Sequence, residues 1–246
     1  MTHIHLIGIG TGNPDHLTGQ ARQAIAAAPL ILIPRKGPGK DDLADLRRQI
    51  VDDIRPEAPI AYFDMPVRDE SQPYLDRVAL WHDEIAQIWE KTIAQHGAPA
   101  DVALLVWGDP SLYDSTLRIA ARLSPAPTLT VVPGITSVQA LTAAHAIALN
   151  TVNAPVTIST GRRLRDAGWP ADTETLVVML DGTCAFQTLE PADFDIWWGA
   201  FLGMENEVLV SGHLQDVSAE IISTRAAARE AHGWIMDTYL LRRRNA

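Results

Sequence analysis

Residues 4–18 read IHLIGIGTGNPDHLT, in which an apolar run gives way to a glycine-rich segment and then to Asn13 and Pro14. The apolar run predicts a short buried strand, and residues 14–28 carry the 3.6-residue period of a helix. Glycines between a strand and a helix are also how a dinucleotide-binding loop begins. A nucleotide site at this loop is therefore the first hypothesis to test.

The opening departs from a dinucleotide-binding fingerprint in two places. Asn13 stands where the fingerprint needs a third glycine, which lets helix and strand pack closely. The second predicted strand, residues 30–34, should end in an acid that holds a ribose hydroxyl, but it ends in Pro34, Arg35 and Lys36. These cations suit at best a 2′-phosphate, so an NADP-linked oxidoreductase is kept only as an alternative.

Composition disfavours several other classes of protein. The 246 residues include 20 basic and 30 acidic ones, and this formal charge of −10 disfavours nucleic-acid binding through phosphate neutralisation. Cys184 is the only cysteine, which excludes an internal disulfide and a thiolate metal cage. The eight histidines show no HExxH spacing, and His3 and His5 alternate as structural residues of a strand would. We therefore expect no metal site.

Cellular location follows from two further features. No uncharged run reaches the ~20 residues of a membrane span, and no secretory signal opens the sequence. A single cysteine suits a reducing compartment. We expect a soluble cytoplasmic protein that binds neither membranes nor nucleic acid.

Strand-like and helical segments alternate along the first part of the chain. Apolar runs predict buried strands in IHLIGIG, LILIP, IAYFDMPV, DVALLVWGDP and TLTVVPG. Helical patterns separate and follow them at residues 14–28, 42–54, 73–96, 115–123 and 136–147. Such alternation favours a parallel sheet.

The regular alternation of strand-like and helical segments changes after about Ala148. PVTIST and TLVVML still flank a helical region, whereas residues 195–203, 206–214 and 233–243 are strand-like and read as closely spaced. The predicted fold class is therefore α/β with two α/β domains and an interdomain cleft. Residues 1–140 form the domain with a parallel sheet, and residues 141–246 form the domain with a mixed sheet.

Three motifs follow the predicted strands in order. GIGTGNPDHLT resembles the GxGxGDxxxLT opening of the tetrapyrrole methylases, WGDPSLYDS resembles that family's GDPxxY mark, and VVPGITS resembles its VxPGxTS mark. Asn13 is a departure, because the family usually has Asp there. Each motif lies at the carboxyl end of a predicted strand, where parallel α/β folds bind their ligands. The resemblance covers the first 140 residues and implies a methyltransferase that uses S-adenosylmethionine.

Within the family, the chain most resembles the methyltransferases that act on precorrins in cobalamin biosynthesis. The resemblance lies in IHLIGIGTGNPDHLT, LILIPRKGPGKDDLADLR and GWIMDTYLLRR. It implies methylation of a ring carbon while the acetyl group on that carbon leaves as acetate. Another precorrin methyltransferase, such as one acting at C-11, diphthine synthase and a non-catalytic tetrapyrrole carrier remain alternatives.

The resemblance also implies site residues. The expected contacts of S-adenosylmethionine are Pro14, Gly108, Asp109, Leu112, Thr136, Ser137, Met179 and Leu180. A precorrin bears many carboxylates, which arginine forks pair well with, and its expected contacts are Gly10, Gly12, Arg35, Lys36, Arg162 and Arg163. Removal of the acetyl group needs a base and an oxyanion donor, for which the candidates are Asp109, Tyr113 and Asp15. A homodimer is expected from the resemblance alone.

Overall fold

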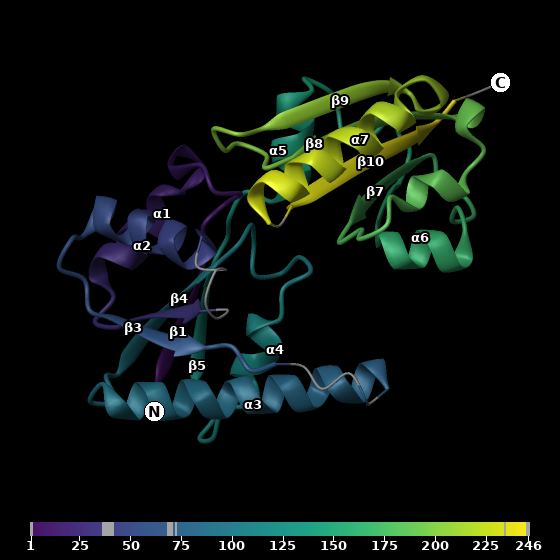
Figure 1. Cartoon of the computed structure of the whole chain (residues 1–246). Helices are drawn as coiled ribbons and strands as arrows, with labels where there is room; N and C mark the ends of the chain where they lie inside the picture. Colours follow the sequence, from purple (N-terminus) through teal and green to yellow (C-terminus); the bar gives the residue numbers. More distant parts are fainter. Residues whose placement is uncertain (1, 36–41, 68–70, 72, 234, 245–246) are drawn as a thin grey trace. The chain divides into compact units, whose positions relative to one another are not determined.

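The structure is a computed structural model that describes residues 2–35, 42–67, 71, 73–233 and 235–244. The chain divides into two units, Met1–Thr136 and Ser137–Ala246, and each unit contains its own five-stranded sheet (Figure 1). Both units are α/β, so the predicted fold class of two α/β domains is confirmed.

The first unit contains an all-parallel sheet, as predicted. Its elements are β1 (His3–Gly8), η1 (Pro14–His16), α1 (Gly19–Ala27), β2 (Ile31–Arg35), α2 (Asp42–Ile54), β3 (Ile60–Asp64), α3 (Tyr74–Gln95), β4 (Asp101–Val106), α4 (Thr116–Ala120) and β5 (Thr128–Val132). The strand order is β3-β2-β4-β1-β5. Because β1 pairs in parallel with both β4 and β5, the carboxyl ends of these three strands meet at one edge.

Helices cover both faces of this sheet, which explains why its inner strands are almost continuously apolar. On one face Ile4 and Leu6 pack in a cluster with Trp89 of α3 and residues of α4. On the other face Ile7 packs in a cluster with Ile25 of α1 and residues of α2. The sheet is therefore a rigid base for the loops at its carboxyl edge.

The single helix predicted over residues 14–28 is wrong, because the structure divides it in two. The short helix η1 ends at His16, and α1 begins after Thr18, whose hydroxyl accepts a hydrogen bond from the Ala21 N–H at 3.0 Å. A threonine before the first turn of a helix accepts a hydrogen bond from a backbone N–H that would otherwise lack a partner, so a new helix starts there.

The second unit contains a mixed sheet, as predicted. Its elements are α5 (Ser137–Ala144), β6 (Val156–Thr160), α6 (Gly161–Ala167), β7 (Thr175–Met179), η2 (Ala185–Thr188), η3 (Pro191–Asp193), β8 (Phe194–Ala200), β9 (Val208–His213), α7 (Leu214–His232) and β10 (Asp237–Arg243). The order is β6-β7-β10-β8-β9, with β6 and β7 parallel and the other pairs antiparallel.

The close spacing predicted for the last strands holds between β8 and β9 but is wrong between β9 and β10. The 19-residue helix α7 separates β9 from β10. Only Leu214, Ile221 and Arg225 are buried on this helix. Val217, Ile222 and Ala228 of this helix are only partly buried against the core, so its apolar face is diffuse and its 3.6-residue period is weak.

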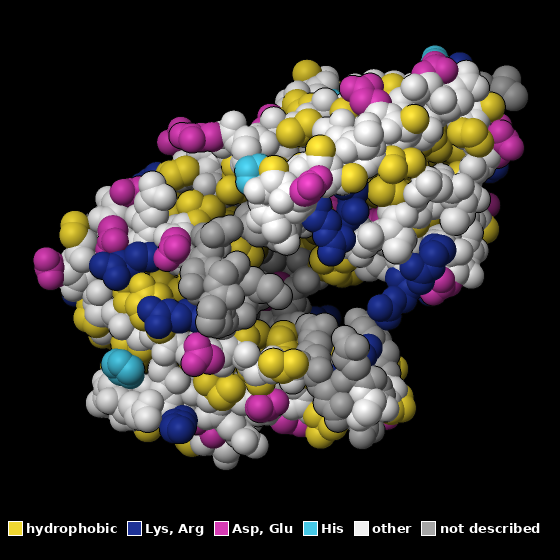
Figure 2. Space-filling view, in the orientation of Figure 1, with side chains coloured by type: hydrophobic (Ala, Val, Ile, Leu, Met, Phe, Trp, Pro, Cys, Tyr) yellow, Lys and Arg dark blue, Asp and Glu magenta, His cyan; other side chains and the backbone are white. Residues whose placement is uncertain are grey.

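Two surface properties bear on the expected partners. Within the described parts of the chain, no helix is both long and apolar enough to cross a membrane. On the face drawn in Figure 2, acidic side chains are scattered among hydrophobic and basic ones instead of forming one patch.

Candidate functional site

Three glycines at the carboxyl edge of the first sheet pack backbone against backbone. Gly8 ends β1, Gly108 follows β4, and Gly134 follows β5. A Cβ atom on Gly134 would lie 2.1 Å from the carbonyl oxygen of Gly108, and one on Gly8 would lie 2.6 Å from the Gly134 nitrogen. No side chain fits at either position, so glycine is what allows the three loops of the sequence motifs to meet.

Backbone hydrogen bonds also join the opening loop to the loop after β4. The Gly10 N–H donates to the Gly108 carbonyl at 3.3 Å, and the Gly108 N–H donates to the Gly10 carbonyl at 2.7 Å. Gly10, Gly12 and Gly108 have φ values of +73°, +114° and +61°, a region that favours glycine. The backbone geometry accounts for these glycines, and substrate contact by Gly10 and Gly12 stays a prediction.

Asp109 ties the second motif to the third. Its buried carboxylate accepts hydrogen bonds from the Ser111 N–H at 2.8 Å, the Ser111 hydroxyl at 2.5 Å and the Gly134 N–H at 2.9 Å. Burial raises the pKa of this carboxyl, but the three hydrogen bonds outweigh burial and hold the pKa below its usual range. Both carboxylate oxygens therefore position the loops, while direct roles in cofactor binding and catalysis stay predictions.

Leu112 and Tyr113 lie on the turn that follows Asp109. The Leu112 N–H donates to the Asp109 carbonyl at 3.2 Å, and Tyr113 has a φ of +50° with 43% of its surface exposed. Partial burial raises the pKa of the Tyr113 phenol, so the hydroxyl is protonated at neutral pH. Non-glycine residues at positive φ cost about 1–3 kcal/mol and gather at ligand sites.

Thr136 and Ser137 end the third motif. The Cα of Thr136 would lie 3.7 Å from a Cβ on Gly108, which places this residue against the second motif. Ser137 begins α5, and its buried Oγ has no hydrogen-bond partner within the described residues. A buried hydroxyl without a partner costs roughly 1–3 kcal/mol, so this atom suits a polar ligand.

The opening loop accommodates Asn13, which stands where the family usually has Asp. The Asn13 side-chain oxygen accepts a hydrogen bond from the Asp15 N–H at 2.9 Å and thereby caps η1. An aspartate could accept the same hydrogen bond, so the local turn does not depend on having Asn rather than Asp at position 13. Pro14 and Asp15 are both exposed at this turn.

Arg47 supports the loop after β4, and sequence reasoning missed it. Arg47 of α2 is buried, and its Nε donates to the Leu105 carbonyl at 3.1 Å. Its guanidinium carbon lies 5.2 Å from the centre of the Trp107 ring. Burial lowers the pKa of Arg47 to about 10, while Asp114 raises it. The spacing of α2 in the sequence offers no signal for such a contact.

The predicted substrate-binding cations occupy different settings. Arg35 is exposed, and its guanidinium carbon lies 3.7 Å from the centre of the Tyr62 ring, whereas Lys36 lies outside the described residues. Arg162 and Arg163 are exposed on the first turn of α6, which Thr160 caps. Exposed arginines at a helix start suit anionic ligands, but substrate contact stays a prediction.

The two histidines of β1 lie at the amino end of this strand. Nε2 of His5 lies 2.9 Å from a carboxylate oxygen of Asp101, and Nε2 of His3 lies 2.8 Å from the Thr130 hydroxyl. The two rings are stacked 4.4 Å apart. The donor atoms of His3, His5 and Asp101 are close enough to hold a metal ion, although the sequence predicts none.

In the second unit, the predicted cofactor contacts lie where β7 ends. Met179 is the last residue of the strand, and Leu180 follows it with 66% of its surface exposed. Leu180 has a φ of +53°. Forcing a leucine into this left-handed region costs roughly 1–2 kcal/mol, so the surrounding residues must hold it there.

With this geometry in view, residues 3–218 match the family model of the Tetrapyrrole (Corrin/Porphyrin) Methylases, and the chain belongs to this family. It is therefore a methyltransferase, as the three motifs predicted. The family uses S-adenosylmethionine.

The chain is 47% identical over 251 residues to a precorrin-6A synthase (deacetylating) of Sinorhizobium sp, and the match covers 99% of this chain and 96% of the relative. A crystal structure of a putative cobalamin synthesis related protein (CobF) from Corynebacterium diphtheriae is 41% identical, with a TM-score of 0.84 over 98% of this chain and 99% of that one. A uroporphyrin-III C-methyl transferase from Thermus thermophilus, complexed with S-adenosylhomocysteine, shares the fold at 21% identity, with a TM-score of 0.58 over 97% of this chain and 96% of that one.

Proposed function

We propose that this chain converts precorrin-5 to precorrin-6A by methylating carbon 1 of the macrocycle while the acetyl group on that carbon leaves as acetate. The observation that carries the proposal is the 47% identity to a precorrin-6A synthase over 99% of this chain. The three family motifs, which meet at one edge of the first sheet, support it. We propose that the enzyme acts as a homodimer, as the family resemblance implies, and in the cytoplasm, as the composition of the sequence suggests.

Residues of the second and third motifs fit S-adenosylmethionine. Gly108 lies next to Thr136, and a Cβ there would be in ordinary van der Waals contact with the Thr136 Cα at 3.7 Å, so the absence of a side chain leaves its backbone accessible to a ligand. The orphaned Oγ of Ser137 suits the polar groups of such a ligand. When bound, S-adenosylmethionine supplies an activated methyl group on a sulfonium centre. The task of the protein is then to align the donor with the ring carbon and to exclude water.

Acetate release needs groups that the protein itself supplies. A water must add to the acetyl carbonyl, and the ring carbon must leave with the electron pair that then takes the methyl group. Tyr113, protonated at neutral pH, is proposed to donate a hydrogen bond to the developing oxyanion. Asp15 is exposed and is proposed as the base that activates the water. We propose a positioning role for Asp109, because both of its oxygens already accept hydrogen bonds.

The substrate's carboxylates are proposed to bind Arg35, Arg162 and Arg163. All three are exposed, and guanidinium groups form forked hydrogen bonds with carboxylates. Lys36 is proposed to add a further charge beside Arg35.

Two measurements on the purified full-length chain test the proposal. Calorimetric titration should show S-adenosylhomocysteine binding at micromolar levels or tighter, together with no binding of NADPH. Incubation with precorrin-5 and S-adenosylmethionine should then release one acetate for each methyl group incorporated. Methyl transfer without acetate would instead identify another precorrin methyltransferase, such as one acting at C-11. Tetrapyrrole binding without S-adenosylhomocysteine binding would identify a carrier.

A further inference from the structure

The segment Leu180–Cys184 holds an unusual backbone at the exit of β7. Leu180 has a φ of +53° and Cys184 a φ of +56°, so two non-glycine residues of one short turn are left-handed. Such conformations persist only where the surroundings determine them, and they gather at ligand sites. Leu180 is largely exposed, whereas Asp181 beside it is buried. The turn thus presents an apolar side chain outward from a fixed base.

Asp181 holds this turn in place. Its carboxylate accepts hydrogen bonds from the Thr183 N–H at 2.9 Å, the Thr183 hydroxyl at 3.2 Å, the Ala185 N–H at 2.6 Å and the Tyr239 hydroxyl at 2.7 Å. A Cβ on Gly161 would lie 2.3 Å from the Asp181 carboxyl carbon, so α6 also closes against it. The carboxylate therefore gathers the backbone of the turn around itself.

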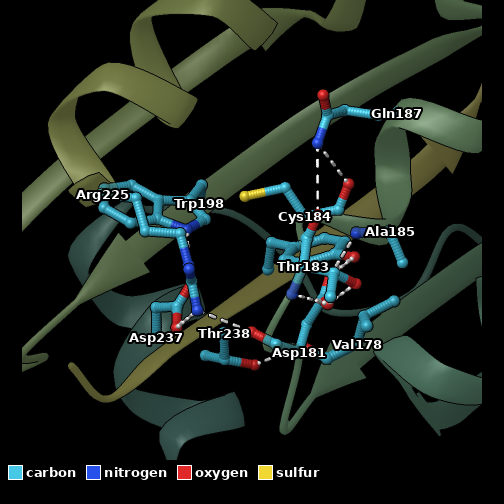
Figure 3. A network of polar contacts seen from close by, with 11 residues as sticks. Val178, Asp181, Thr183, Cys184, Ala185, Gln187, Trp198, Arg225, Asp237 and Thr238 are labelled. Atoms are coloured by element: carbon cyan, nitrogen blue, oxygen red, sulfur yellow. Dashed lines mark hydrogen bonds and ion pairs between the residues drawn. The ribbon is translucent and has the colours of Figure 1, made fainter. Parts of the chain in front are cut away.

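Arg225 of α7 forms a hydrogen bond with the same turn (Figure 3). Its Nη2 donates to the Asp181 carbonyl at 2.7 Å, and its Nε donates to the Asp237 carboxylate at 2.8 Å. The side chains of Arg225 and Asp237 are only 11% and 6% exposed. The Trp198 indole N–H donates to the same Asp237 oxygen at 3.0 Å, which fixes the carboxylate from β8.

A buried ion pair such as Arg225–Asp237 adds little net stability, because both charges lose their hydration. Removing two charges from water costs about as much as their attraction returns, and well-packed apolar residues often serve stability equally well. The ion pair does something that an apolar pair could not do, because its guanidinium reaches the carbonyl of Asp181. That bond fixes the peptide between Asp181 and Gly182, inside the turn that Leu180 begins.

We propose that Arg225 is a positioning residue for the methyl donor: anchored by Asp237, it holds Leu180–Cys184 in the conformation that presents Leu180 to S-adenosylmethionine. The inference rests on the proposed function and deepens it. It assigns a role in cofactor binding to a helix that none of the three sequence motifs includes.

Two substitutions in the full-length protein test this proposal. Arg225→Lys keeps the charge beside Asp237 but lacks the fork that spans both partners. Tyr239→Phe keeps the ring and removes one donor to Asp181. The matched control is Phe194→Leu, a core substitution in β8 at the end that pairs with Arg243, away from the turn. Each variant is measured by urea unfolding, by amide exchange at Thr183 and Ala185, and by calorimetric titration with S-adenosylhomocysteine.

We expect Arg225→Lys to bind S-adenosylhomocysteine about tenfold more weakly, or about 1.4 kcal/mol, with faster exchange at both amides. Tyr239→Phe should weaken binding about threefold, and it carries the test alone if Arg225→Lys does not fold. Phe194→Leu should keep wild-type affinity even where it loses more stability. Wild-type affinity in a folded variant with faster exchange overturns the positioning role, and so does an equal loss in the control. A wild-type protein that does not bind S-adenosylhomocysteine overturns the proposed function and this inference with it.

Discussion

Replacing Gly134 by alanine tests whether the contact between the three glycine loops maintains the cofactor site. The added methyl carbon would lie 2.1 Å from the Gly108 carbonyl oxygen and 2.8 Å from the Gly8 carbonyl carbon. The loops would have to separate by about 1 Å before ordinary contact distances returned. Overpacking of this kind costs roughly 1–3 kcal/mol. The movement also stretches the 2.9 Å hydrogen bond from Gly134 to Asp109.

We therefore expect the free energy of unfolding to fall by about 2 kcal/mol and S-adenosylhomocysteine to bind at least tenfold more weakly, about 1.4 kcal/mol. Urea unfolding and calorimetric titration measure the two effects. Gly19→Ala is the control, because a Cβ there meets nothing within 4 Å at the start of α1. It should keep wild-type affinity and equal or slightly greater stability.

The reasoning is refuted if Gly134→Ala unfolds at the wild-type urea midpoint and binds with wild-type affinity. Such a result would mean that the loops are not packed as described. A loss of stability without a loss of affinity would separate the glycine contact from the cofactor site.

Three further predictions concern the same loops and the exposed arginines. Gly108→Val puts a β-branched residue at a φ of +61° and costs at least about 1–2 kcal/mol of strain. A folded variant should bind S-adenosylhomocysteine more than tenfold more weakly, and unchanged affinity would place the cofactor elsewhere. Asp109→Asn removes a carboxylate whose pKa is lowered on folding, so its stabilisation is complete above the unfolded pKa of about 3.9 and is lost as pH falls through the lower folded value. The gap in unfolding free energy between wild type and this variant should thus be constant at neutral pH and narrow below about pH 4; a gap that persists to pH 2 argues against the hydrogen bonds described. Arg162→Ala and Arg163→Ala should each raise the KM for the precorrin about tenfold, less at high salt, with S-adenosylhomocysteine affinity retained. If the double variant matches wild type at low salt, these arginines are only solvated.

The first unit was largely predictable from the sequence because its strands are apolar runs buried on both faces. Each run ends in glycine or proline, so the ends of β1, β4 and β5 were visible before any pairing was known. The parallel order then places their loops together. The Asp109 carboxylate could be named as a site residue, but its bond to Gly134 could not be predicted, and the buried Arg47 was missed, because the partners of both residues are distant in sequence.

The second unit was less predictable for the same physical reason. The buried ion pair of Arg225 and Asp237 has no signal in the sequence, since neither residue alone shows that the other neutralises it. Asp181 and Arg225 are 44 positions apart, and no periodic pattern links a strand exit to a helix interior. Leu180 could be proposed as a contact, but only the backbone angles reveal that it is strained.

The strand order of the first unit has a consequence for synthesis on the ribosome. The strand β1 is made first, yet its neighbours β4 and β5 are made last, and the bond between His3 and Thr130 joins positions 127 apart. Contacts of such long sequence separation slow folding, because the loop must close before the contact forms. With translation at about 5–20 residues per second, the nascent β1 waits about 6–25 seconds until both partners have been made. The glycine loop at Gly8 can reach its final conformation only after Gly134 has left the exit tunnel. A chain stalled before that point therefore lacks the carboxyl edge of the first sheet, where the three glycine loops meet.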